Sequence, residues 1–586
     1  MKKLRDFLAE GGTLLFDGAM GTYFAAQPGR ADARCELANL TEPEAVAAVH
    51  RAYLEAGCRA VKTNTFTAGV DLAEGCEGQA LAMIEAGCRI ARECAEPYGA
   101  YVFADIGPAP EGGTLSRGEI YVRQAEAFLE QGVRGFLAET LPSDEGVAEL
   151  ARFLKGQCPD AFLIVSYAAA FDGTTREGYS AEALFRRTAA LEDVDAVGFN
   201  CVSGPQHLLN LIRRLDRRGT RLCVMPNAGY PTVLGRRTVY QGGADYFGGK
   251  LAEIAQAGAC IVGGCCGTTP AHIAQAAEAL AKMGPVVRAA AEDRSAPPSA
   301  AHVNALADKL DAGRRVVAVE LDPPADDDIG FFLEGVGALR DAGADAVTIA
   351  DCPIGRPRAD SSLLACKIRR ELGIEPLPHM TCRDRNLNAT KALLLGLSIE
   401  GVHNVLLVTG DPIPSEARDE VKSVFNFNSR KLARYVSALN ETVLRTPFRI
   451  FGALNVNARN FEMQLKIARE KEENGVSGFL TQPVLSREAL ENLRAAREAL
   501  HGKILGGIYP VVSYKNACFL HNEIAGMRIC PEIIGLYEGK ERDTAEDLAV
   551  RISVAIAGEI APYTDGLYLM TPFKRVGLMV RILKSL

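Results

Sequence analysis

The sequence has 586 residues, more than one hydrophobic core usually supports, so we expect two large domains. Charged residues make up 24% and the net charge is −8 without a long basic run, which excludes nucleic acid as a partner. The start of the chain lacks the apolar stretch of a signal peptide, and no window approaches the roughly 18 apolar residues of a membrane span. We therefore expect a soluble, cytoplasmic protein that does not associate with membranes.

In the first half of the chain, short apolar runs alternate with longer amphipathic stretches such as EPEAVAAVHRAYLEAG. This alternation is typical of buried parallel strands joined by crossover helices. The eight runs are TLLFDGA, RAVKTNTF, YVFADIG, RGFLAET, FLIVSYA, DAVGFNC, LCVMPNAG and ACIVGGCCG. Eight such units predict a (β/α)8 TIM barrel, an α/β fold, over residues 1–285.

Each of these runs ends in a polar or reactive residue, and the carboxyl ends of the strands are where such barrels carry their active sites. The residues are Asp17, Asn64, Asp105, Glu139, Ser166, Asn200 with Cys201, Asn227, and Cys265 with Cys266. They are the candidates for the site of the first barrel.

The clearest change in composition is the stretch RAAAEDRSAPPSAAH, which is rich in Ala, Pro and Ser and has no apolar periodicity. We place a linker there, at residues 286–302. Eight further apolar runs follow it: RVVAVELDPP, DAVTIADCP, PLPHMTCRD, NVLLVTGDP, FRIFGALNVN, SGFLTQPV, KILGGIYPVVS and DGLYLMTP. They predict a second (β/α)8 barrel over residues 303–586, and the lack of a repeat between the halves predicts a different enzyme.

Sixteen cysteines in such a composition do not resemble a secreted disulfide framework, and clustered cysteines in a reducing compartment more often bind metal or react. Cys265 and Cys266 are adjacent in GGCCGT, and Cys201 ends the strand two before theirs. Three thiolates leave one tetrahedral position of a zinc ion open, as in catalytic sites, and a thiol that filled it would have a lowered pKa. Packing cysteines, or a structural zinc with a fourth ligand elsewhere, are the alternatives; the absence of CxxC spacing disfavours the latter.

The motifs DGAMGT, CELANL, TNTF, GFNC, PNAG and GGCCGTTPAHI resemble the homocysteine S-methyltransferase family over roughly residues 1–285. The resemblance implies that Cys201, Cys265 and Cys266 bind Zn²⁺ and that Asp17 and Glu139 hold the ammonium group of homocysteine. Two simpler interpretations stay open. Asp17 also suits a turn or helix cap before Gly18, and Asn64 and Asn200 suit hydrogen bonds within the rim, without substrate contact.

The second half lacks GxGxxG and P-loop motifs. The series VELDPP, PHMTCRD, VTGDP, GALNVNARN, AREKEENGVSGFLTQPV and GGIYPVVSY resembles methylenetetrahydrofolate reductase over roughly residues 303–586. The resemblance implies FAD as cofactor, NAD(P)H as electron donor, and reduction of 5,10-methylenetetrahydrofolate to 5-methyltetrahydrofolate.

The same resemblance assigns roles to single residues. It makes Glu320 the general acid that protonates a folate nitrogen, and places Asp411 near the flavin and the pterin, where it tunes the redox potential. The remaining assignments are His379 and Lys471 to the flavin, and Gln482 and Tyr514 to the folate. Three departures from the family pattern bear on flavin affinity and on the electron donor: VELDPP replaces FEFFPP, Ala350 replaces a threonine, and Thr409 replaces an arginine.

Together the halves predict an enzyme that makes methyltetrahydrofolate and methylates homocysteine. No segment resembles a cobalamin module, so we expect a separate corrinoid protein to deliver the methyl group, with S-methylmethionine as the rival donor. Alternatively, the chain is a reductase whose first barrel is a zinc-stabilised module that binds homocysteine or a corrinoid protein, or its second half is an inactive folate-binding module. A homo-oligomer is compatible with the sequence.

Overall fold

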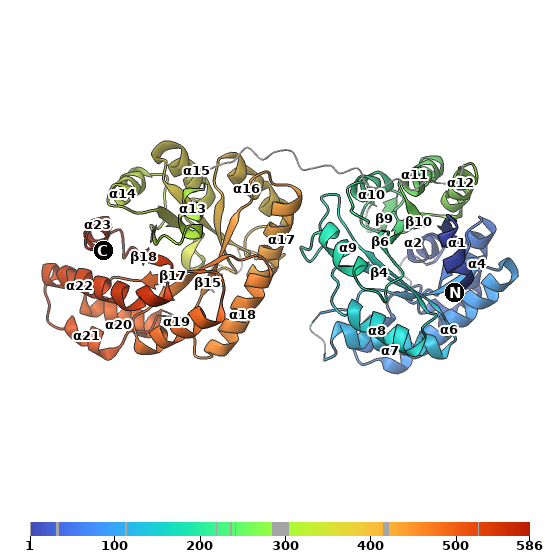
Figure 1. The fold of residues 1–586 in the computed structure, drawn as a ribbon, viewed down its shortest axis with the longest axis horizontal. Helices are drawn as coiled ribbons and strands as arrows, with labels where there is room; N and C mark the ends of the chain where they lie inside the picture. The colour runs from blue at the N-terminus through green and yellow to red at the C-terminus, as the bar shows by residue number, and fades with distance from the viewer. Residues whose placement is uncertain are drawn as a thin grey trace. The chain divides into compact units, whose positions relative to one another are not determined.

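The computed structural model describes residues 2–586 apart from 31–33, 112–113, 218, 235–236, 241, 284–303, 414–420 and 525–526. The chain forms two compact units, Met1–Ala296 and Pro297–Leu586, each with strands at its centre and helices around them (Figure 1). The linker predicted at 286–302 lies outside the described residues. None of the described helices combines the length and the apolar character needed to cross a bilayer.

The first unit contains an eight-stranded parallel sheet in the order β1-β10-β7-β6-β5-β4-β3-β2. A parallel bridge between Phe16, which follows β1, and Ala60 of β2 joins the two ends of this order and closes the barrel. All eight strands predicted from the apolar runs are confirmed. They are β1 (Leu14–Leu15), β2 (Ala60–Lys62), β3 (Tyr101–Ile106), β4 (Gly135–Leu141), β5 (Phe162–Tyr167), β6 (Ala196–Asn200), β7 (Arg221–Met225) and β10 (Ala259–Val262).

The strands of the first unit are mostly apolar because both of their faces are buried, one inside the barrel and one under the helices. Phe16, Phe103 and Phe162 fill the interior, and Leu4 and Leu8 of the first helix pack against this cluster. The helices are α1 (Lys2–Ala9), α2 (Gly21–Ala25), α3 (Ala38–Thr41), α4 (Pro43–Glu55), α5 (Ala68–Ala73), α6 (Glu77–Ala95), α7 (Arg117–Glu130), α8 (Val147–Gln157), α9 (Ala181–Ala189), α10 (Pro205–Ile212), α11 (Ala244–Gln256) and α12 (Pro270–Ala281).

One element of the first unit was not predicted. An antiparallel hairpin of β8 (Pro231–Leu234) and β9 (Arg237–Tyr240) follows β7. It lies outside the parallel sheet, in the connection that leads from the carboxyl end of β7 to α11, so the search for buried strands did not reveal it.

The second unit is a closed parallel barrel in which the strands follow one another in sequence order from β11 to β18. All eight predicted strands are again confirmed. They are β11 (Val316–Glu320), β12 (Ala346–Ile349), β13 (Glu375–Thr381), β14 (Asn404–Val408), β15 (Arg449–Leu454), β16 (Gly478–Pro483), β17 (Lys503–Ile508) and β18 (Gly566–Met570).

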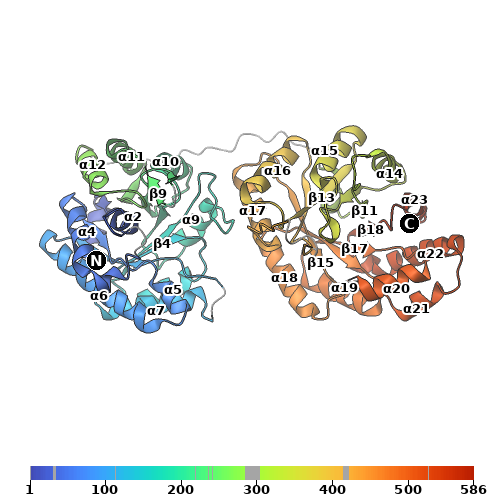
Figure 2. The same ribbon diagram turned by 180° about the vertical axis from the view of Figure 1, so that it is seen from behind.

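The interior of the second barrel holds residues such as Leu377, Phe451 and Leu505, and Leu306 and Leu310 of its first helix pack against them. Figure 2 shows the helices on the outside of this barrel. The helices of the second unit are α13 (Ala305–Asp311), α14 (Gly330–Asp341), α15 (Ser361–Leu372), α16 (Leu387–Ile399), α17 (Ser429–Thr442), α18 (Phe461–Glu473), α19 (Arg487–Ala499), α20 (Tyr514–Glu523), α21 (Pro531–Leu536), α22 (Arg542–Ile560) and α23 (Val576–Leu583).

Candidate functional sites

Three cysteine side chains meet at the carboxyl end of the first barrel. Cys201 directly follows β6, and Cys265 and Cys266 follow β10 after two glycines. Their Sγ atoms all lie within 4.8 Å of one another, and those of Cys201 and Cys266 are 3.6 Å apart. The structure therefore brings together the three residues that were predicted to bind zinc.

The backbone around the cysteines is held in a conformation that directs the sulfur atoms toward one another. Cys201 lies in the left-handed region with a φ of 57°, which is uncommon for a residue other than glycine. A Cβ on Gly264 would lie 2.4 Å from Thr268 Oγ1, so only glycine fits there. The hydroxyl of Thr268 donates to the Cys265 carbonyl at 2.7 Å, which fixes the loop.

The three thiols favour a thiophilic cation. Hydrogen bonds from Cys201 and Cys265 lower the pKa of the Cys266 thiol, so this sulfur is readily a thiolate. The other two thiols have raised pKa values, for Cys201 chiefly because it hydrogen-bonds to its two neighbours. A divalent ion that binds thiolates would replace these shared protons, and three sulfur ligands with a fourth position free suit zinc.

A buried layer of charged side chains lies on the first four strands of the same barrel. It consists of Asp17 after β1, Lys62 of β2, Asp105 of β3 and Glu139 of β4, each at most 5% exposed. Lys62 Nζ lies 3.8 Å from Asp17 Oδ1 and 3.5 Å from Glu139 Oε1. Burial raises the pKa of Asp17 to about 6, and the nearby Lys62 opposes this effect. The two predicted ammonium-binding carboxylates therefore lie beside the same lysine.

Sequence analysis did not single out Lys62. Ala60, two residues earlier on the same strand, points into the barrel, and side chains alternate along a strand. This alternation could have identified Lys62 as a residue of the barrel interior, because it directs the Lys62 side chain inward as well.

Asn200 connects the charged layer to the cysteines. Its Nδ2 donates to Glu139 Oε2 at 2.7 Å and lies 3.8 Å from Cys265 Sγ. Its Oδ1 accepts from the Thr140 amide at 2.8 Å and from Ser166 Oγ at 2.7 Å. The interpretation of Asn200 as a hydrogen-bonding rim residue agrees with these contacts.

Two other rim residues also have structural partners. Asn64 Nδ2 donates to the Cys35 carbonyl and to Asn39 Oδ1, both at 2.8 Å, so its amide holds the loop that contains Cys35. Asp17 Oδ2 accepts from the Lys62 amide at 3.0 Å, whereas Asp17 Oδ1 has no hydrogen-bond partner within the described residues. Asp17 thus combines a backbone contact with one carboxylate oxygen that is buried and unsatisfied.

The unpredicted hairpin contributes to the cysteine site. Its last residue, Tyr240, forms a side-chain hydrogen bond that helps to lower the pKa of Cys266. The ring of Tyr240 also packs where a Cβ on Gly267 would be, 2.2 Å from Tyr240 Cγ. The hairpin therefore forms part of the wall around the three sulfur atoms.

At the carboxyl end of the second barrel, Glu320 of β11 lies between two other inward-facing side chains. Tyr568 of β18 donates a hydrogen bond to Glu320 Oε2, and His379 Nε2 of β13 lies 3.7 Å from the same oxygen. Burial, with the nearby Asp322, raises the pKa of Glu320 to about 7. Burial lowers the pKa of His379 to about 4, so the imidazole is neutral. Tyr568 was not predicted, although the period of two along β18 directs it inward.

The other predicted residues of the second barrel lie on different elements around the rim. Lys471 of α18 is buried, donates to the Ala453 carbonyl at 2.8 Å, and has its pKa lowered to about 8 by burial. Asp411 follows β14 and is exposed, and Gln482 is half-buried at the end of β16. Tyr514 begins α20 and is 42% exposed.

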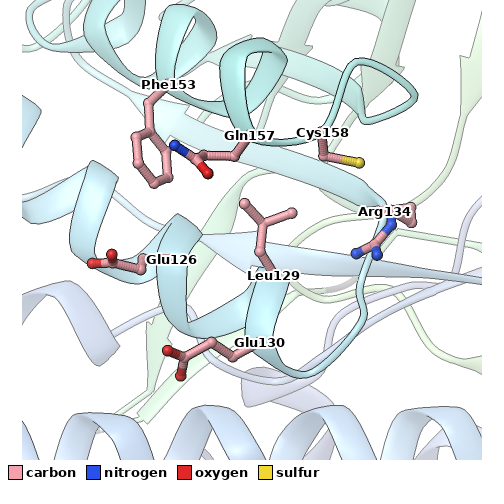
Figure 3. A pocket seen from close by; sticks show the side chains of 7 residues that line it. All are labelled: Glu126, Leu129, Glu130, Arg134, Phe153, Gln157 and Cys158. Carbon is pink, nitrogen blue, oxygen red and sulfur yellow. The ribbon is translucent and has the colours of Figure 1, made fainter.

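A surface pocket of about 390 Å³ in the first unit lies apart from the cysteines (Figure 3). Arg134 immediately precedes β4 and Cys158 ends α8, so the pocket is at the amino ends of the strands. It is lined by Glu126, Leu129, Glu130, Arg134, Phe153, Gln157 and Cys158. None of the predicted site residues lines it, and in barrels of this type the amino ends serve stability rather than catalysis.

Comparison with known proteins assigns each barrel to a family. The profile of the homocysteine S-methyltransferase family matches residues 14–280, and that of methylenetetrahydrofolate reductase matches residues 305–586. The methionine synthase of Mycobacterium tuberculosis is 33% identical over 302 residues, which are 46% of this chain and 24% of that protein. The methionine synthase of Mycobacterium leprae is 31% identical over 291 residues, which are 45% of this chain and 24% of that protein. The chain thus spans about a quarter of the length of these curated relatives.

Among solved structures, the homocysteine methyltransferase MmuM from Escherichia coli is similar to part of the chain. Its oxidized form is 25% identical with a TM-score of 0.40, and covers 47% of this chain and 98% of its own. Its metallated form is 26% identical with a TM-score of 0.40, and covers 48% of this chain and 99% of its own. From the family profiles we conclude that the chain joins a domain of the homocysteine S-methyltransferase family, at residues 14–280, to a domain of the methylenetetrahydrofolate reductase family, at residues 305–586.

Proposed function

We propose that the chain is a bifunctional one-carbon enzyme. In this proposal the first barrel methylates the thiol of homocysteine at a zinc ion to give methionine. The second barrel uses FAD and NAD(P)H to reduce 5,10-methylenetetrahydrofolate to 5-methyltetrahydrofolate. The observation that carries the proposal is the meeting of three Sγ atoms within 4.8 Å at the carboxyl end of a homocysteine S-methyltransferase barrel.

In the first barrel, Cys201, Cys265 and Cys266 would hold the zinc ion. When bound, the ion supplies an open tetrahedral position and a positive charge that lowers the pKa of the incoming thiol. Asp17 and Glu139 would bind the ammonium group of homocysteine from the charged layer below the sulfur atoms. Asn200 contacts both Glu139 and Cys265, and so keeps the ammonium site at a fixed distance from the thiol site.

In the second barrel, Glu320 would act as the acid. A pKa of about 7 leaves this carboxyl group partly protonated at neutral pH, so it can give a proton to a folate nitrogen and help the bridging methylene to open. FAD, when bound, supplies the hydride that the opened methylene accepts. His379 Nε2 is buried and, among the described residues, has no hydrogen-bond partner, which suits a contact with a bound group.

The remaining predicted residues of the second barrel are proposed to contact the flavin or the folate. The ammonium of Lys471 uses one donor on the Ala453 carbonyl and keeps two for a flavin phosphate. Asp411 would lie near the flavin and pterin, and Gln482 and Tyr514 would contact the folate.

We further propose that a separate corrinoid protein brings the methyl group. Direct transfer from the N5-methyl group of methyltetrahydrofolate to a thiol is difficult, because the N5 nitrogen of tetrahydrofolate would leave as an anion unless it is first protonated, and such an anion is a poor leaving group. Phe171, Val202 and Tyr230 are 66%, 44% and 47% exposed, and they lie in the connections after β5, β6 and β7 around the cysteines. Such exposed apolar groups beside the site suit a macromolecular donor better than they suit free S-methylmethionine. We also propose that the protein works in the cytoplasm, whose reducing conditions suit its sixteen free cysteines.

Each half of the proposal has its own test on one preparation. We expect stoichiometric zinc, and methionine formation from homocysteine with a methylated corrinoid protein but not with S-methylmethionine. We also expect yellow protein whose flavin is bleached by NADH or NADPH and reoxidised by methylenetetrahydrofolate. Methionine formation that persists after zinc removal would refute the first half, and colourless protein that FAD does not reconstitute would refute the second.

A further inference from the structure

Lys62 has a place in the charged layer that the predicted roles of Asp17 and Glu139 do not account for. Its side chain is buried, with its Nζ 3.8 Å from Asp17 Oδ1 and 3.5 Å from Glu139 Oε1. It is also the basic side chain that acts on the carboxyl group of Asp105. The two carboxylates expected to hold a substrate ammonium therefore already have an ammonium between them.

The layer nevertheless keeps acceptors for a further cation. Asp17 Oδ1 and Asp105 Oδ1 are both buried and have no hydrogen-bond partner within the described part of the chain. Buried polar atoms without partners are costly, and they recur where a ligand completes the contacts. Asp17 follows β1 and Asp105 belongs to β3, and these two strands lie on either side of β2, which carries Lys62.

The charges of the layer lead to the same conclusion. Burial and the adjacent Glu139 raise the pKa of Asp105 well above its usual range, and a side-chain hydrogen bond with Glu139 acts in the same direction. The layer thus places three buried carboxyl groups, those of Asp17, Asp105 and Glu139, around one buried ammonium group, that of Lys62. Acidic groups therefore outnumber basic groups in this buried site, which suits the binding of one further cation.

We propose that Lys62 is a positioning and specificity-determining residue, which balances one of the two carboxylates and leaves the other to bind the α-ammonium group of the thiol substrate. This inference rests on the proposed homocysteine methylation. Lys62 also fixes Asp17, because its backbone amide donates to Asp17 Oδ2. If Lys62 instead took the place of the substrate ammonium, the layer would keep its excess of carboxyl groups, and removal of Lys62 would improve homocysteine binding.

The test is a calorimetric titration of the zinc-loaded full-length protein with two thiols, which needs no methyl donor. The probes are L-homocysteine and 4-sulfanylbutanoic acid, which is homocysteine without its amino group. The variants are Lys62→Met, Lys62→Gln and the charge-conserving Lys62→Arg, with zinc content and thermal unfolding measured for each. Lys62→Gln gives a second measurement if Lys62→Met does not fold.

We expect the wild-type protein to bind homocysteine at least about tenfold more tightly than the amine-free thiol. Lys62→Met and Lys62→Gln should lose most of this preference through weaker homocysteine binding, while zinc content and affinity for the amine-free thiol stay the same. Lys62→Arg should keep part of the preference. Tighter or unchanged homocysteine binding, or an equal loss for both thiols, would overturn the role of Lys62. An unchanged protein that binds neither thiol would instead overturn the proposed function.

Discussion

Asn200 and Glu139 are joined by a 2.7 Å hydrogen bond between strands β6 and β4, and this bond ties the charged layer of the first barrel to its cysteines. Because the same amide lies 3.8 Å from Cys265 Sγ, a change at Asn200 affects both halves of the proposed homocysteine site. Contacts of this kind orient metal ligands without binding the metal themselves.

Replacing Asn200 by Ala should weaken zinc binding by roughly 10- to 100-fold. It should also lower the free energy of unfolding by about 1–3 kcal/mol, because Glu139, the Thr140 amide and Ser166 lose a buried partner. Chelator competition and urea unfolding measure the two effects. Asn210→Ala, on the exposed surface of α10, is the matched control and should change neither quantity. Full zinc affinity in Asn200→Ala would contradict the proposed connection.

Replacing Cys266 by Ser should abolish stable zinc binding and methionine formation, because the oxygen is a poorer zinc ligand than a thiolate. The loss of zinc affinity should exceed the roughly 10- to 100-fold loss expected when a residue that only orients the metal ligands is replaced. Reduction of the flavin by NAD(P)H and its reoxidation by methylenetetrahydrofolate should persist, since these steps are proposed for the second barrel. Cys76→Ser, at an exposed cysteine, is the control. Retention of zinc by Cys266→Ser would indicate a different ligand set.

The strands could be predicted from the sequence because burial on both faces makes them continuous apolar runs. The three cysteines could be predicted as neighbours because all of them follow strands of one barrel, whose carboxyl ends meet at a common rim. In both cases each signal is a run or motif of a few residues at one strand.

The roles of Lys62 and Tyr568 could not be predicted from short motifs of this kind. Each is a single polar residue within an apolar strand, and its meaning depends on partners from other strands. Lys62 is stable in the interior because Asp17 and Glu139 surround it, and Tyr568 finds Glu320, 248 positions earlier. The hairpin that ends at Tyr240 was missed for a similar reason, since its contact with Cys266 is formed only in the folded rim.

The glycine before the cysteine pair offers a steric test. In Gly264→Ala the new Cβ would lie 2.4 Å from Thr268 Oγ1, so the loop that carries Cys265 must shift. We expect a loss of about 1–3 kcal/mol in the free energy of unfolding, with weaker zinc binding. Gly249→Ala, in the open interior of α11, is the control and should stabilise the protein by about 0.5–1 kcal/mol. Equal behaviour of the two variants would show that the loop tolerates the added methyl group.

Replacing Glu320 by Gln removes the proposed acid and keeps its size. Flavin reduction by NAD(P)H should continue, whereas the folate half-reaction should slow by about 10²- to 10⁴-fold. Stopped-flow absorbance separates the two half-reactions, and Glu334→Gln on the exposed side of α14 is the control. Equal losses in both half-reactions would contradict an acid role.

The pH dependence of the folate half-reaction gives a further test through Tyr568. In its proposed acid role Glu320 acts in the protonated form, and burial raises its pKa to about 7, so the rate should be highest below pH 7 and fall as the pH rises above it. The hydrogen bond from Tyr568 stabilises the ionised carboxylate and lowers its pKa. Tyr568→Phe removes this bond, so the pKa should rise and the falling limb should move to higher pH.

The fall in rate can be followed directly by single-turnover oxidation of the reduced flavin by methylenetetrahydrofolate, measured at pH values below and above 7. Tyr563→Phe, at a half-buried phenol outside the barrel interior, should leave the profile unchanged. A limb that moves to lower pH in Tyr568→Phe, or that is the same in both variants, would mean that Tyr568 does not control the ionisation of Glu320. A movement to higher pH in Tyr568→Phe alone would tie the acid of the second barrel to the tyrosine that the sequence analysis missed.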